Sequence, residues 1–246
     1  MRIPLCCALL IAVVAGGPRA SEAQRLPDLT GVWTDYVEPG QPDVLAGGQG
    51  GLAPGLPFTE EARRKSDAYR KLVAGTGDTP GGFCLGPGMP SLVLGGATYP
   101  MEIVQRPEQI TILYELHNEI RRIYFGARNA PDADRLPFRN GYSSGRWEGE
   151  TLIVDTTHLV EQVDARYPHS AQARVVEQYR LTTGAKGERV LVIDFTLTDP
   201  VFYTRPVTAQ KKWMAVTNGH LLPYDCAEEG WRQRLEQLER AANRKP

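Results

Sequence analysis

The second half of the chain alternates between apolar and polar positions in short runs that turn residues separate. Side chains of a strand point alternately to its two faces, so these runs predict antiparallel strands with one buried face. We expect them over residues 101–106, 109–116, 119–125, 141–147, 150–157, 174–182, 189–198 and 209–216, after an earlier strand that begins near residue 31. The pattern predicts a mainly β fold, either a single antiparallel β-barrel or a sandwich.

Two segments follow a helical pattern instead. Thr59 is a typical N-cap and acidic residues follow it in the first turn, which predicts an N-terminal helix over residues 59–73. A C-terminal helix is expected over residues 227–240, where an apolar stripe could pack on the sheet through Trp231, Leu235 and Leu238.

The first 23 residues are typical of a cleaved secretory signal peptide. Arg2 precedes an apolar run over residues 5–15, and small residues stand at 21 and 23, where a signal peptidase would cleave. The run is shorter than the roughly 20 residues that cross a bilayer, and no later run reaches that length. We therefore expect a periplasmic or secreted protein that begins at Gln24 and has no membrane span.

The rest of the chain, 24–246, is expected to form a single β-rich domain. Segments 38–57 and 78–100 are rich in Gly and Pro and are expected to be long loops. The whole chain has a formal net charge of −1 with both signs mixed along it. Since there is no basic stripe, we do not expect a nucleic-acid partner.

Cys84 and Cys226 are the cysteines that remain once the signal is removed. Two thiols in an oxidising compartment most often pair, so we expect a disulfide between them. The alternative is a catalytic thiol, for which the sequence offers no adjacent base.

Two hairpins can be aligned from their turns. A two-residue turn at residues 117–118 would place Leu113 opposite Arg122 and make one face apolar, with Ile110, Ile112, Tyr114, Ile123 and Phe125. Arg121 would share that apolar face with Tyr114. A turn at residues 148–149 would place Tyr142 opposite Asp155.

One segment resembles a known signature. Residues 141–157 read GYSSGRWEGETLIVDTT, which resembles the signature of a large family of exported, uncharacterised bacterial proteins, with Tyr142 where we expect a histidine. The similarity extends to Glu115, residues 121–124, Glu177, residues 199–200 and Cys226. Gly31-Val32-Trp33 also resembles the Gly-x-Trp that opens many lipocalin barrels. The resemblance implies export and a lipocalin-like β fold, and it transfers no chemistry.

Asp155, His158 and His169 form the densest group of candidate acid–base residues. A histidine beside a carboxylate is a common general base, since the carboxylate fixes the tautomer. The alternative is a solvated loop after a strand. Their spacing matches no established metal motif, so we expect no metal and no cofactor.

Glu115, Arg122 and Tyr124 would share one hairpin face, and Tyr142 and Trp147 lie on the next hairpin. If these faces point inward, the side chains would line a ligand pocket. If they point outward, Glu115 and Arg122 are an exposed ion pair worth under about 1 kcal/mol. The opposite face is the more apolar one, which favours the outward arrangement.

Three functions are compatible with the sequence. The first is a protein that binds a small, partly apolar molecule in an internal barrel cup, which four Trp, ten Tyr and six Phe could line. The second is a cofactor-independent lyase, isomerase or hydrolase on the same scaffold. The third is an envelope interaction protein that uses a sheet edge or the long loops. The sequence favours binding of a small-molecule ligand or substrate.

Overall fold

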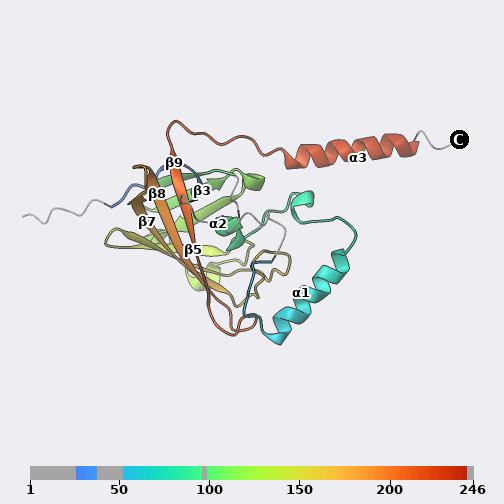
Figure 1. Cartoon of the computed structure of the whole chain (residues 1–246), viewed down its shortest axis with the longest axis horizontal. Helices are drawn as coiled ribbons and strands as arrows, with labels where there is room; N and C mark the ends of the chain where they lie inside the picture. Colours follow the sequence, from blue (N-terminus) through green and yellow to red (C-terminus); the bar gives the residue numbers. More distant parts are fainter. Residues whose placement is uncertain (1–25, 38–51, 96–98, 243–246) are drawn as a thin grey trace, which may run out of the picture.

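Nine strands close into a barrel in which each strand lies beside the next one along the chain, and β9 closes on β1 (Figure 1). The structure is a computed structural model that describes residues 26–37, 52–95 and 99–242. The strands are β1 (Gly31–Asp35), β2 (Met101–Arg106), β3 (Gln109–Tyr114), β4 (Ile120–Tyr124), β5 (Tyr142–Glu148), β6 (Thr151–Thr157), β7 (Arg174–Thr183), β8 (Arg189–Thr198) and β9 (Val207–Val216). The expected mainly β fold is confirmed, and the structure is the barrel rather than the sandwich.

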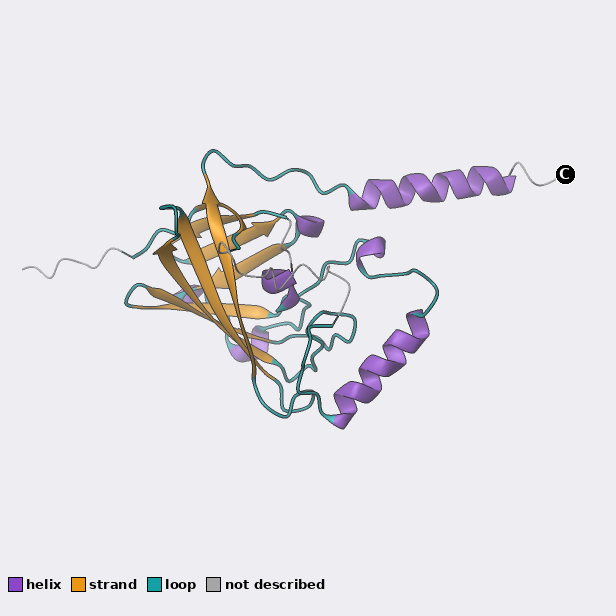
Figure 2. Cartoon of the chain, in the orientation of Figure 1, coloured by secondary structure: helices purple, strands orange, loops and turns teal. Residues whose placement is uncertain are grey.

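The helical elements within the described ranges are α1 (Glu60–Val73), α2 (Ser91–Gly95), α3 (Cys226–Ala242) and the short 3-10 turns η1 (Gly81–Phe83), η2 (Leu116–Asn118), η3 (Gly126–Arg128) and η4 (Asp132–Asp134). The two long helices lie clear of the strands (Figure 2), whereas the short helix α2 packs into the core through Leu92, Val93 and Leu94. The two predicted helices are present, but α2 and η1 fall inside a segment that was expected to be loop. No helix in these ranges is long and apolar enough to cross a bilayer. The predicted signal peptide and residues 38–51 of the first predicted loop lie outside the described residues.

One pair of neighbouring strands, β4 and β5, is parallel. Strands that alternate in direction close a ring only when their number is even, so a nine-stranded barrel needs such a pair. The segment 125–141 carries the chain back so that β5 runs in the direction of β4. The ladder between them is short, with Ile123 opposite Ser143 and Tyr124 opposite Ser144. We call this contact the parallel seam.

The predicted register of the first hairpin is wrong by two residues. Thr111 lies opposite Arg122, and the connection has four residues because the Tyr114 N–H donates to the Glu119 carbonyl (2.9 Å). The turn needs left-handed backbone, which His117 adopts (φ 57°). A slip of two positions leaves every side chain on its own face. The predicted apolar face therefore does point into the barrel, with Ile110, Ile112, Tyr114 and Ile123 buried.

The second hairpin shows the same two-residue error. Tyr142 lies opposite Thr157 rather than Asp155, and Ser144 takes the place opposite Asp155. The turn is made by residues 149–150, because Gly149 adopts the positive φ (60°) that such a two-residue turn requires.

Large apolar side chains fill the barrel. Trp33, Met101 and Trp213 are fully buried, and Trp33 Nε1–H donates to the Leu29 carbonyl (3.0 Å). Strand β8 contributes alternate residues to this core, namely Leu191, Ile193, Phe195 and Leu197. The gathering of these residues on one face is the outcome that the alternating pattern predicts.

The expected packing of the C-terminal helix on the sheet is wrong. Helix α3 projects away from the barrel (Figure 1), and Leu235 is exposed. Its main contact with another element is η1, where Cys84 and Cys226 form the predicted disulfide with their Cα atoms 5.6 Å apart. An amphipathic sequence shows that a helix has an apolar face, but it does not identify the surface that this face covers.

Candidate functional site

A buried ion pair crosses the middle of the barrel. Arg121 on β4 and Glu177 on β7 are 2% and 0% exposed, and the two guanidinium NH groups donate to the two carboxylate oxygens. Burial is the largest single effect and lowers the pKa of Arg121, but the charge and hydrogen bonds of Glu177, together with Tyr179 and Tyr114, raise that pKa on balance. Arg121 therefore stays charged inside the barrel.

Every donor group of this arginine has a partner. Arg121 Nε donates to Ser143 Oγ (3.1 Å), NH2 donates to Thr156 Oγ1 (2.8 Å) and NH1 donates to Tyr179 Oη (3.2 Å). Tyr179 in turn donates to Glu177 Oε1 (3.0 Å). A side chain that borders a water-sized cavity keeps solvent-accessible surface. The side chains of this network keep almost none, so no such cavity borders them. The network is therefore closed to solvent, and it joins β4, β5, β6 and β7 across the parallel seam.

This network also contains a serine in a spacing that hydrolases use. Residues 141–145 read Gly-Tyr-Ser-Ser-Gly, which matches the Gly-x-Ser-x-Gly of a nucleophile elbow. That motif needs an exposed serine at a sharp strand-to-helix turn. Ser143 instead lies within β5, is buried, and bonds to Thr156 Oγ1 (2.9 Å). Its surroundings are those of a structural serine.

A pocket of about 370 Å³ opens at one end of the barrel. We call this the loop end, where segments 52–59, 158–173 and 199–206 meet the start of β9. The lining of the pocket, which we call the end pocket, is Ala53, Pro54, Gly55, Leu56, Pro57, Leu94, Arg166, Tyr167, Arg205, Val207, Thr208, Ala209 and Gln210. Its apolar wall comes from Val207 and Ala209 of β9 and from the residues before α1, while Thr208 and Gln210 of the same strand add polar groups.

Hydrogen bonds and ring contacts fix this wall. The Ala53 N–H donates to the Arg166 carbonyl (2.9 Å), which joins two lining segments far apart in the sequence. The Tyr167 ring packs edge-on against Phe195 of the barrel core, with centroids 5.6 Å apart. Burial raises the pKa of Tyr167, so its hydroxyl stays protonated near neutral pH. The pocket is thus formed by side chains held in place.

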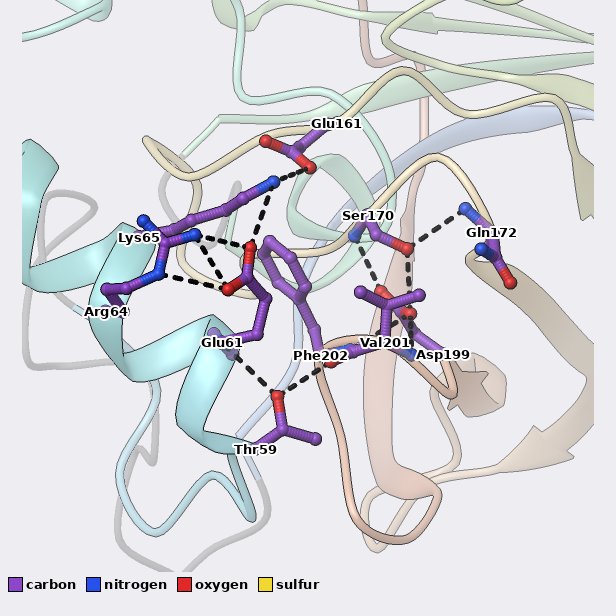
Figure 3. A network of polar contacts seen from close by, with 11 residues as sticks. Thr59, Glu61, Arg64, Lys65, Glu161, Ser170, Gln172, Asp199, Val201 and Phe202 are labelled. Atoms are coloured by element: carbon purple, nitrogen blue, oxygen red, sulfur yellow. Dashed lines mark hydrogen bonds and ion pairs between the residues drawn. The ribbon is translucent and has the colours of Figure 1, made fainter.

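A carboxylate ties loops of the loop end together (Figure 3). Asp199 accepts hydrogen bonds from the Ser170 N–H and hydroxyl (2.6 and 2.8 Å) and from the Val201 N–H (2.9 Å). Thr59, the N-cap of α1, donates its hydroxyl to the Val201 carbonyl (2.7 Å). The start of α1 and two barrel loops are therefore tied at one point, which supports the loop end.

The three predicted acid–base residues do not form one site. Asp155 is on the outer face of β6, where it accepts hydrogen bonds from the side chain of Arg174 (2.8 Å to Nε). His169 is fully buried at the loop end, and its Nδ1–H donates to the Tyr167 carbonyl (3.0 Å). Burial lowers the pKa of His169, so it is neutral near pH 7.

His158 lines a different hollow on the outer surface. This outer groove, about 600 Å³, is lined by residues that include Asp132, Thr157, His158, Gln172 and Arg174. His158 adopts left-handed backbone (φ 55°), and its Nδ1 lies 2.9 Å from Thr157 Oγ1. Its Nε2 lies 3.8 Å from Asp132 Oδ1.

Four of the five predicted ligand-binding residues lie outside the barrel lumen. Arg122 is exposed on the outer face of β4, and Glu115 accepts a hydrogen bond from the Leu222 N–H (2.7 Å) in the connection to α3. Tyr124 and Tyr142 stack on the outside with centroids 5.2 Å apart. Trp147 faces inward and packs on the core.

The end pocket was missed at the sequence level. Arg166 and Arg205 stand in loops with no periodicity, and nothing in their spacing links them to Leu94 or to residues 53–57. In the part of the chain that the structure describes, no three His, Cys, Asp or Glu side chains gather to hold a metal ion.

No protein-family model matches the chain, and no curated protein or solved structure matches it significantly. The assignment of a function therefore depends on the geometry of the site.

Proposed function

We propose that this is an exported β-barrel protein that binds a small, partly apolar molecule, and that the molecule sits in the end pocket. The barrel middle is occupied by the closed Arg121–Glu177 network and by large side chains. The observation that carries the proposal is the end pocket, whose volume of about 370 Å³ lies in the range of small-molecule sites. Its apolar wall and polar rim suit a ligand with an apolar body.

The neutral fluorophore phenylnaphthylamine tests this proposal, since its emission rises on entry into an apolar site. Thr208 is exposed at the rim, so Thr208→Trp should fill the pocket without disturbing the core. We expect this substitution to weaken probe binding by roughly tenfold or more, because the indole ring would occupy the space in which the probe contacts the apolar wall. Ala209→Leu, deeper in the same wall, should act in the same direction.

The matched control is Thr111→Trp, which places the same bulk on the outer face of β3. It should leave the affinity unchanged. If both pocket variants bind the probe as the parent protein does, the end pocket is not the ligand site and the proposal is wrong.

A second candidate function is acid–base catalysis in the outer groove. The Thr157–His158 contact leaves the imidazole Nε2 facing Asp132, an arrangement in which histidine could take a proton from a hydroxyl. Hydrolysis of small aryl esters tests it. His158→Gln should abolish turnover, whereas His220→Gln should have no effect, and equal rates in all three proteins would exclude this activity.

A further inference from the structure

The charge of the end pocket is one-sided. Among the described residues that line it there are two arginines, Arg166 and Arg205, and no aspartate or glutamate. A guanidinium keeps its charge at any pH that the protein would meet. A molecule that enters this pocket therefore meets positive charge beside an apolar wall.

Arg205 is the arginine best placed to contact a ligand. It lies in the connection between β8 and β9, directly before the strand that supplies the inner wall, and it is exposed. It makes no ion pair with any described residue, whereas Arg174 and Arg180 on the outer barrel each pair with an aspartate. Its fork of donors is thus available to an acidic group at the pocket mouth.

Arg166 lies deeper in the pocket than Arg205. It is buried, and its backbone carbonyl is held by Ala53 on the opposite lining segment. The backbone of Arg166, next to Tyr167, is therefore held in place at the loop end.

We propose that the ligand is a small anionic amphiphile. Its apolar body packs on Leu56, Leu94, Val207 and Ala209, and its carboxylate, sulfonate or phosphate pairs with Arg205 at the mouth, where two parallel N–H donors match two anionic oxygens. This inference rests on the proposed binding function and adds the chemical class of the ligand.

Two fluorescent probes of one scaffold test it. Anilinonaphthalene sulfonate and phenylnaphthylamine share their rings and differ in the sulfonate. We expect the sulfonate to bind roughly tenfold to a hundredfold more tightly, as one charge-assisted interaction allows. Arg205→Gln should remove most of that advantage, and Arg205→Lys should retain part of it because the charge stays.

The control is Arg122→Gln, which removes one positive charge from the exposed outer face of β4. It should leave the ratio of the two affinities unchanged. Since Arg205 is exposed, its variants should melt within about 2 °C of the parent protein, which a thermal scan verifies.

The outcomes separate the two proposals. Equal affinities for both probes, or equal effects of Arg205→Gln and Arg122→Gln, would overturn the anionic ligand. If Thr208→Trp still weakens the binding of the neutral probe in that case, the proposed binding function stands without the anionic ligand. If neither Thr208→Trp nor Ala209→Leu weakens the binding of either probe, the binding function itself is refuted.

Discussion

The buried Arg121–Glu177 pair makes the sharpest prediction about stability. Glu177→Gln keeps the shape of the side chain but leaves the guanidinium of Arg121 uncompensated inside the barrel. Breaking a buried pair on one side costs about 3–5 kcal/mol of unfolding free energy. Since a domain is stable by only about 5–15 kcal/mol, this change should bring the protein close to unfolding.

Removing both charges should be less harmful than removing one. In the double variant Arg121→Met/Glu177→Leu neither charge of this pair is left, and Ser143 and Thr156 still bond each other. Tyr179 loses its charged partners, which costs about 1–3 kcal/mol. With the single variants Arg121→Met and Glu177→Leu this double variant completes a double-mutant cycle, in which the two sites should couple by at least about 2 kcal/mol.

Urea unfolding at pH 7, followed by tryptophan fluorescence with the disulfide intact, measures these changes. Asp155→Asn is the matched control, because the Arg174–Asp155 pair has the same chemistry but its side chains are 57% and 26% exposed. That variant should cost under about 1 kcal/mol. If Glu177→Gln costs no more than Asp155→Asn, or if the double variant is as unstable as the sum of the singles, the network does not hold the barrel as we argue.

Three further predictions concern other parts of the chain. Non-reducing thiol titration of the unfolded protein should find Cys84 and Cys226 blocked, and replacing both by Ser should lower stability by about 2–4 kcal/mol in urea unfolding. Burial lowers the pKa of His169 in the folded state, so the unfolded chain binds the extra proton and stability should fall as pH drops below about 6.5, by at most about 1.4 kcal/mol per pH unit. His169→Asn should flatten that part of the pH profile, and an unchanged slope would contradict the assignment. Intact mass of protein from the envelope fraction should correspond to a chain that starts after Ala23; retention of the first 23 residues would contradict export by cleavage.

Strands and faces could be predicted from the sequence, but strand partners could not. The alternating pattern has a period of two, so it fixes which side chains are buried and leaves a slip of two residues undetected. This explains why Ile112 and Ile123 were placed on the inner face while Arg122 was paired with the wrong residue. Arg121 on an apolar face was the one visible sign of the interior network.

The end pocket could not be predicted from local pattern. Its walls come from the residues before α1, from α2, from the loop that holds Tyr167 and from β9, and no periodicity connects them. Asp155, His158 and His169 were grouped because they are close in sequence. In the structure Asp155 points outward to Arg174, whereas His169 is buried at the loop end. A site whose residues come from loops far apart in the sequence can be recognised only once the fold has brought those loops together.

The parallel seam has a consequence for the order of the chain. Val32 lies opposite Val216, so the start of β1 and the end of β9 are neighbours in space. A circular permutant that joins these ends and opens the segment 125–141 would run from β5 through β9 and β1 to β4. All its consecutive strands would then be antiparallel, and the remote β1–β9 pairing would become local. The short parallel seam would become the pairing that joins the two chain ends, so all the antiparallel ladders could form before those ends meet.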